Sequence, residues 1–406
     1  MTRYHASWIL PISGPPIRDG WVVIDRERIV AYGSDGRRAP GPQEEREIDL
    51  GRVAIMPGLV NAHTHLELSY LRGDVPAGSS FVAWVRAVMA ARRQYPDPRA
   101  PAILDSVDRG IAEALRCGTA IVGDISNTLV TFGPLVSSPL AAVVFCELIG
   151  FHAPDPTALV ARASLQIESL PSTHRVRATL AAHAAYSVAP LVLRAIRETL
   201  DRDPFATTSI HLAESVDEVE FIRTAGGPFR DLLEALGVWD PGWVAPGVSP
   251  VQYLADCGFL SGRVLAVHGV QMTPVDLTRL AARGTTLVTC PRSNERTGAG
   301  KPPIEAFYAA GVRVAVGTDS LASTPDLNLF AELAAMRRLA PAVPPSALIE
   351  SATLQGARAL GFDGEYGTME PGRRARLLAV DVPPGAGNVE EYLVSGIQPE
   401  QIRWIE

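Results

Sequence analysis

Lysine is almost missing from this sequence: Lys301 is the only one, and arginine supplies the rest of its 37 basic residues. Acidic residues outnumber basic ones, and the formal net charge is −7. A nucleic-acid partner requires a basic face that neutralises phosphates, so this charge argues against general nucleic-acid binding. Cysteine is scarce as well: the four cysteines contain no CxxC pair, which predicts reduced residues used for packing.

Long apolar runs are also missing. None reaches the roughly 18 residues of a membrane-spanning helix, and the N-terminus lacks the charged-then-apolar pattern of a signal peptide. We therefore expect a cytoplasmic protein with no membrane partner. No GxGxxG follows a predicted strand, which weakens a dinucleotide-binding alternative. The 406 residues, 47% of them hydrophobic and 20% charged, suffice for one large α/β domain and a small one.

Short apolar runs alternate with helix-period segments through the middle of the chain, which is typical of a parallel sheet covered by helices. Eight such units over about 300 residues favour a (β/α)₈ TIM barrel over an open sheet. The expected strands are Val53–Val60, Thr119–Val122, Ala141–Phe145, Arg177–Ala181, the run into His211, Arg263–His268, Thr285–Cys290 and Arg313–Val316.

Both ends of the chain instead contain short strand-like runs separated by glycine and proline. We expect residues 1–55 and 365–406 to form one composite β-sandwich domain beside the barrel, which would span residues 56–364.

Four residues of metal-ligand type fall at or just after the ends of predicted strands. His63 and His65 end the first strand, His211 the fifth and Asp319 the eighth. The carboxyl ends of barrel strands converge on one rim, where active sites lie. Imidazole and carboxylate suit a divalent ion such as Zn²⁺, which lowers the pKa of a bound water to roughly 7. The set predicts a metal centre and a hydrolytic reaction together.

Further polar residues share this rim. His268 ends the sixth strand and either ligates the metal or orients its water. Glu214, three residues after His211, suits a general acid/base role, although a glutamate at a helix start is often only a helix-dipole partner. Together with Asp319, these two are the expected catalytic residues.

The expected substrate contacts follow other strands. His183 ends the fourth strand, in a run otherwise too apolar for a packed histidine. Glu67 and Glu147 follow the first and third strands, and each either binds substrate or forms a structural ion pair. Arg292 follows the seventh strand, and its guanidinium suits bidentate recognition of an anionic group.

The single lysine bears on metal number. Binuclear hydrolytic barrels often bridge two metals with a carboxylated lysine from the fourth strand, whereas Lys301 lies beyond the seventh. We therefore expect one divalent ion per chain, zinc in preference to iron. A non-catalytic metal-binding or scaffold protein is the alternative from another class, and it fits poorly because a structural zinc site is closed and would not need Glu214 and His268 beside it.

On these residues the chain resembles the amidohydrolase superfamily nearly end to end. The terminal strands, the segment Met56–His65 and the segment Gly317–Ser323 carry the resemblance. The branch it resembles holds cytosine, guanine, adenosine and S-adenosylhomocysteine deaminases and the triazine chlorohydrolases. Glu67 and the Cys290–Asn294 stretch are similar to one subgroup, the aminodeoxyfutalosine deaminases of the alternative menaquinone pathway.

The resemblance implies a role for each residue. One zinc or iron would be held by the set His63, His65, His211 and Asp319. Glu214 would deliver a proton to the ring nitrogen N1, Asp319 and His268 would take the proton of the attacking water, and His183 would contact substrate. The implied reaction is deamination of 6-amino-6-deoxyfutalosine, a nucleoside with a distal carboxylate. Deamination of adenosine, S-adenosylhomocysteine or guanine, or triazine dechlorination, stays an alternative, and a homodimer stays open.

Overall fold

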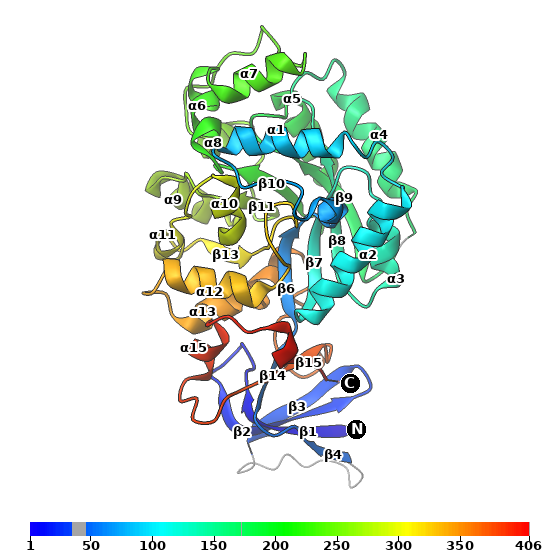
Figure 1. Ribbon diagram of the computed structural model, residues 1–406, viewed down its shortest axis with the longest axis vertical. Helices are drawn as coiled ribbons and strands as arrows, with labels where there is room; N and C mark the ends of the chain where they lie inside the picture. The colour runs from blue at the N-terminus through cyan, green and yellow to red at the C-terminus, as the bar shows by residue number, and fades with distance from the viewer. Residues whose placement is uncertain (35–45, 172, 406) are drawn as a thin grey trace.

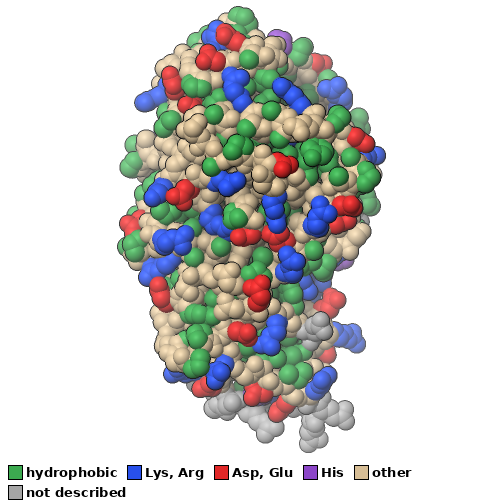
Figure 2. Space-filling model, in the orientation of Figure 1, with side chains coloured by type: hydrophobic (Ala, Val, Ile, Leu, Met, Phe, Trp, Pro, Cys, Tyr) green, Lys and Arg blue, Asp and Glu red, His purple; other side chains and the backbone are tan. Residues whose placement is uncertain are grey.

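A computed structural model describes residues 1–34, 46–171 and 173–405. A sheet built from both ends of the chain lies at one end of the long axis, and a helix-covered barrel fills the rest (Figure 1). Among the described residues, no helix is both long and apolar enough to cross a bilayer. On the face drawn in Figure 2, acidic and basic side chains are interspersed.

The terminal sheet is mixed and has seven strands in the order β15-β14-β5-β1-β2-β3, with β4 paired to β1. From the N-terminal part come β1 (Thr2–Ile9), β2 (Ile17–Asp25), β3 (Arg28–Ser34), β4 (Arg46–Asp49) and β5 (Val53–Pro57), and from the C-terminal part β14 (Leu377–Asp381) and β15 (Ile402–Trp404). Because β14 pairs with β5, the two ends of the chain share one unit, as the sequence predicts. The boundaries at residues 55 and 365 stay predictions.

The expected strand Val53–Val60 is two strands in the structure. β5 ends at Pro57 in the terminal sheet, and β6 (Leu59–Thr64) begins the barrel after Gly58. A Cβ at Gly58 would lie 2.7 Å from that of Ala120, so the change of sheet requires a residue without a side chain.

The barrel strands form two parallel runs, β6-β7-β8-β9 and β10-β11-β12-β13. Beyond β6 they are β7 (Thr119–Ser126), β8 (Ala141–Leu148), β9 (Val176–Ala182), β10 (Thr208–Leu212), β11 (Val264–His268), β12 (Thr286–Thr289) and β13 (Arg313–Val316). Parallel bridges join the runs at both seams, between Ala184 and His211 and between Thr64 and Asp319. The predicted α/β barrel is therefore confirmed.

Helices cover the outside of the barrel, which explains why every residue of β7 and β8 is buried. The α-helices are α1 (Phe81–Arg92), α2 (Pro101–Arg116), α3 (Phe132–Ser137), α4 (Pro156–Glu168), α5 (Pro190–Leu200), α6 (Val216–Thr224), α7 (Pro228–Ala235), α8 (Pro250–Asp256), α9 (Pro274–Arg283), α10 (Pro291–Thr297), α11 (Ile304–Ala309), α12 (Leu329–Leu339), α13 (Pro345–Ser351), α14 (Leu354–Ala359) and α15 (Val389–Leu393), with 3-10 turns η1 (Leu66–Leu71) and η2 (Pro399–Gln401). α1 and α7 lie at the end of the barrel away from the terminal sheet (Figure 1).

Candidate active site

The carboxyl ends of the barrel strands bring three of the expected ligands to one point. His63 lies in β6, His65 follows it, and Asp319 follows β13. Nε2 of His63 and Nε2 of His65 are 3.2 Å apart. Oδ1 of Asp319 is 3.7 Å from the first nitrogen and 3.3 Å from the second. These three side chains offer converging lone pairs, as a cation requires.

His211 completes the set from β10. Its Nδ1 donates a hydrogen bond to the carbonyl oxygen of His183 at 2.8 Å, so the lone pair of the neutral ring lies on Nε2. The ring centroid is 5.0 Å from that of His63 and 5.5 Å from that of His65. Three imidazoles and one carboxylate fit a divalent ion such as zinc.

Two residues of this cluster have strained backbone conformations. His268 and Asp319 have positive φ values of 79° and 62°, a left-handed conformation that is costly for residues other than glycine. Gly317 lets β13 reach β6, because a Cβ there would lie 2.6 Å from the carbonyl oxygen of His63. That oxygen accepts the backbone N–H of Asp319 at 3.0 Å, so closure of the barrel also fixes the carboxylate.

Burial sets the charge of the imidazoles. It lowers the pKa of His65 to about 3, that of His268 to about 3 and that of His183 to about 4. Burial alone would raise the pKa of Asp319, but the neighbouring imidazoles of His63, His65 and His268 hold it well below the usual range. At neutral pH the site therefore offers neutral rings beside an ionised carboxylate.

Glu214 follows β10 and is buried against the same cluster. Its Oε2 lies 3.5 Å from Nε2 of His268. Burial, reinforced by the charges of Asp319 and Glu218, raises the pKa of Glu214 well above its usual range. Glu218 holds the segment in place by accepting the backbone N–H groups of Ala213 at 3.0 Å and of Glu214 at 2.9 Å. Burial therefore favours the protonated form of this carboxyl group, the form that can donate a proton to a ligand.

The orientation of His268 decides between its two expected roles. The side-chain amide of Asn294 donates to its Nδ1 at 3.0 Å, so the neutral ring carries its proton on Nε2. Nε2 is then a hydrogen-bond donor beside Glu214. A nitrogen of His268 also lies within 4.8 Å of ligand atoms of His63 and His211, which is close enough for a shared metal ion. This tautomer suits a residue that orients water better than a metal ligand.

A cavity of about 760 Å³ opens over this cluster. His183 and Glu147 both line it, as the sequence predicts for substrate contacts. Nδ1 of His183 is 2.6 Å from the hydroxyl of Ser187, which fixes the ring. Oε2 of Glu147 accepts the amide of Asn127 at 2.9 Å, while its buried Oε1 has no hydrogen-bond partner among the described residues. That oxygen lies 3.5 Å from Nδ1 of His211, so Glu147 packs directly against an expected metal ligand.

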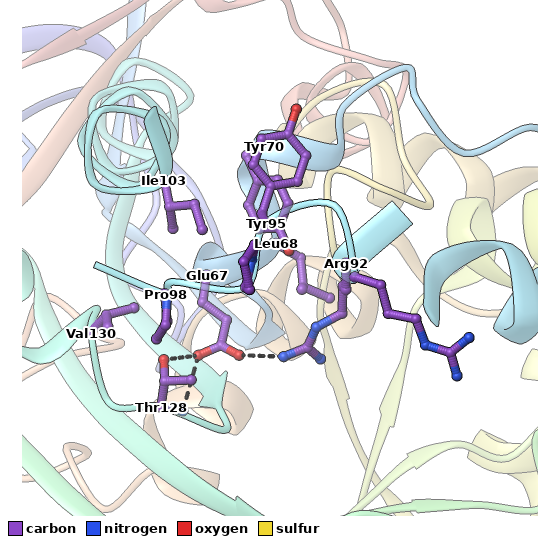
Figure 3. A pocket seen from close by; sticks show the side chains of 11 residues that line it. Glu67, Leu68, Tyr70, Arg92, Tyr95, Pro98, Ile103, Thr128 and Val130 are labelled. Carbon is purple, nitrogen blue, oxygen red and sulfur yellow. Dashed lines mark hydrogen bonds and ion pairs between the residues drawn. The ribbon is translucent and has the colours of Figure 1, made fainter. Parts of the chain in front are cut away.

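Glu67 takes the structural one of its two expected roles. Its carboxylate accepts the hydroxyl of Ser126 at 2.6 Å. It also accepts the hydroxyl of Thr128 at 2.9 Å and pairs with Arg92 at 3.3 Å (Figure 3). It lies outside the lining of the main cavity.

Arg292 also lies outside the cavity lining, contrary to the expectation that it meets an anionic substrate at the rim. Its Nη1 binds Asp326 at 2.8 Å, and its Nε lies 3.5 Å from Glu332, which is fully buried in α12. The first turn of α10 directs this side chain outward against α12, so its charge is already neutralised.

The sequence analysis missed the apolar wall of the cavity. This wall includes Phe81 and Trp84 of α1 and Phe229 of α7. Phe229 stacks on Tyr186 with ring centroids 3.8 Å apart. The sequence could have indicated this wall, because α1 and α7 belong to segments that follow barrel strands, and such segments reach over the catalytic rim.

The comparisons agree with this geometry. The amidohydrolase family matches residues 54–400. A 5-methylthioadenosine/S-adenosylhomocysteine deaminase of Moorella thermoacetica is 31% identical over 386 residues, 92% of this chain and 84% of the relative. An aminodeoxyfutalosine deaminase of Deinococcus radiodurans is 32% identical over 359 residues, 84% of this chain and 81% of the relative. An adenosine deaminase structure from Xanthomonas campestris with bound zinc superposes with a TM-score of 0.83 at 27% identity, covering 99% and 90% of the two chains.

Proposed function

This chain belongs to the amidohydrolase family, and from that premise we propose that it is a metal-dependent aminohydrolase that deaminates an adenine nucleoside. The specific substrate we propose is 6-amino-6-deoxyfutalosine, which would place the enzyme in menaquinone biosynthesis. A cytoplasmic location and a homodimer remain predictions.

The metal would be held at the strand ends by the set His63, His65, His211 and Asp319. When bound, a divalent ion such as zinc supplies an acidified water at neutral pH. The zinc in the similar adenosine deaminase structure supports this choice of ion.

The protein's own groups carry the protons. Glu214, protonated because it is buried, donates to ring nitrogen N1 and so makes C6 electron-poor. Asp319, ionised in this setting, accepts a proton from the attacking water. His268 orients that water through its Nε2–H. A C6–O bond forms. Asp319 then passes its proton to the amino group, the C6–N bond breaks, and ammonia leaves, while the proton of the new hydroxyl returns to Glu214 and leaves a carbonyl at C6.

One observation carries the proposal: the buried carboxyl group of Glu214 lies beside a converging donor set in an open cavity. A structural zinc site is closed by its ligands and has no use for an acid beside it. Here Glu214, His268 and Asp319 all line the same cavity of about 760 Å³.

The second candidate is deamination of 5-methylthioadenosine or S-adenosylhomocysteine. The relative with that activity in its name is as similar as the aminodeoxyfutalosine deaminase, at 31% against 32% identity. The apolar wall of Phe81, Trp84 and Phe229 would accept the sugar substituent of either nucleoside.

Ammonia release by the metal-loaded protein tests the proposal. The panel contains aminodeoxyfutalosine, methylthioadenosine, S-adenosylhomocysteine, adenosine, guanine and a chlorinated triazine. We expect the highest kcat/KM for aminodeoxyfutalosine and loss of activity on chelation. Chloride release from the triazine without ammonia release from any nucleoside would refute the aminohydrolase assignment, and a preference for methylthioadenosine would select the second candidate.

A further inference from the structure

A second, smaller pocket adjoins the main cavity at the end of α1. It has a volume of about 260 Å³. Leu68, Arg92 and Arg93 line both cavities. Because the main cavity also contains Glu214, a single extended molecule can contact the proton donor at one end and these shared residues at the other.

The wall of the small pocket is mostly apolar and aromatic. The rings of Tyr70 and Tyr95 meet edge-on with centroids 4.8 Å apart, and Figure 3 shows them beside Leu68. Ile103 and Val130 also line the pocket. Such a wall suits a flat aromatic group.

The two arginines of the pocket differ in whether their guanidinium groups already have partners. Arg92 is held by two partners, since Nη1 donates to Asn127 at 3.0 Å and Nη2 lies 3.3 Å from Glu67. Arg93, the residue that caps α1, is exposed and forms no ion pair among the described residues. Its charge is therefore available to a ligand.

The charge of the pocket favours an anionic group over a zwitterion. Glu67 is its one acidic lining residue among those described, and both oxygens of this carboxylate are occupied by Arg92, Ser126 and Thr128. A ligand ammonium group would find no free carboxylate there, whereas a ligand carboxylate would find Arg93.

We propose that Arg93 and the pocket beside Tyr70 and Tyr95 form a distal subsite for an aromatic carboxylate attached to the sugar end of the substrate. This inference rests on the proposed nucleoside deaminase function and gives Arg93 the anion-recognition role that the sequence assigned to Arg292. The subsite would favour an aromatic monoanion over the amino-acid tail of S-adenosylhomocysteine.

Arg93→Ala tests the subsite, with Arg86→Ala as the matched control. Arg86 is an exposed arginine on the same helix that lines neither cavity. The measured quantity is kcat/KM for aminodeoxyfutalosine divided by kcat/KM for methylthioadenosine. Loss of a charge-assisted contact should lower this ratio roughly ten- to hundred-fold in Arg93→Ala, and the ratio should stay at the wild-type value in Arg86→Ala.

An unchanged ratio in Arg93→Ala overturns the inference, as does an equal fall in Arg86→Ala, which would indicate only long-range attraction. Benzoate, observed by ligand-detected NMR, separates this failure from that of the proposed function. If wild type does not deaminate aminodeoxyfutalosine, the proposed substrate is wrong. Benzoate binding that Arg93→Ala abolishes would then still support the subsite, and no difference between the two proteins would overturn it.

Discussion

Replacing Glu214 by glutamine tests whether this residue acts by donating a proton. Only 4% of Glu214 is exposed, and its Oε2 lies 3.5 Å from Nε2 of His268. Glutamine has nearly the same shape, and its amide still donates a hydrogen bond to a ring nitrogen. It cannot release a proton to that nitrogen, so binding should persist while the chemical step fails.

The expected loss follows from that role. A positioned general acid contributes roughly 100- to 10,000-fold to the rate, which corresponds to about 2.7 to 5.4 kcal/mol of activation free energy. Burial favours the protonated form of this carboxyl group, so the general-acid contribution should be seen in kcat. KM should change little, since the glutamine retains the contact.

Ammonia release under saturating and limiting substrate gives kcat and KM separately, and elemental analysis gives the metal content. Glu220→Gln is the control, because Glu220 is exposed on α6, the helix that follows Glu214. A variant at Glu214 that keeps the wild-type kcat, or that changes only KM, would refute the reasoning. Loss of metal from this variant would show that Glu214 supports the ligands instead.

Three further predictions concern the surroundings of this group. His63→Ala and Asp319→Ala should each lose both metal and ammonia release, and elemental analysis that finds two ions per wild-type chain would contradict the single-ion expectation. Glu218→Ala should lower the free energy of unfolding by about 2 to 4 kcal/mol in chemical denaturation, because two buried N–H groups lose their acceptor; unchanged stability would show that water replaces the carboxylate. Arg292→Ala should lower the free energy of unfolding by about 1 to 3 kcal/mol, because the hydrogen bond to Asp326 and the contact with the buried Glu332 are lost; kcat/KM should fall equally for aminodeoxyfutalosine and methylthioadenosine, and a selective fall for the carboxylate substrate would restore Arg292 to the substrate site.

The barrel was predictable because its strands are buried on both faces. Every residue of β7 and β8 is buried, so each strand is a continuous apolar run that periodicity detects. The break between β5 and β6 at Gly58 could not be predicted. Both strands are fully buried, so their residues form one continuous apolar run in the sequence. What separates them is the partner strand, β14 for one and β7 for the other, and pairing over such distances leaves no local signal.

In the site, likewise, the sequence predicts where a residue lies along the chain's elements but not where its side chain points. His63, His211 and Asp319 could be placed because the ends of parallel barrel strands meet at one rim. Arg292 was also placed correctly after its strand, but its side chain points toward Asp326 and toward Glu332 of α12, which lie far along the chain. Spacing along a sequence predicts which element carries a residue, whereas a buried acceptor elsewhere decides where a long side chain points.

This division also bears on why relatives of nearly equal similarity carry the names of different nucleoside deaminases. The donor set is fixed by strand ends and by barrel closure, as the contact between Asp319 and the backbone of His63 shows. The wall that meets the rest of the substrate comes from α1 and α7, which connect strands and can change without disturbing the ligands. Two relatives at 31% and 32% identity accordingly carry the names of different nucleoside deaminases. Substrate choice in this chain should therefore be sought at the end of α1, at Arg93, and not among the residues that activate water.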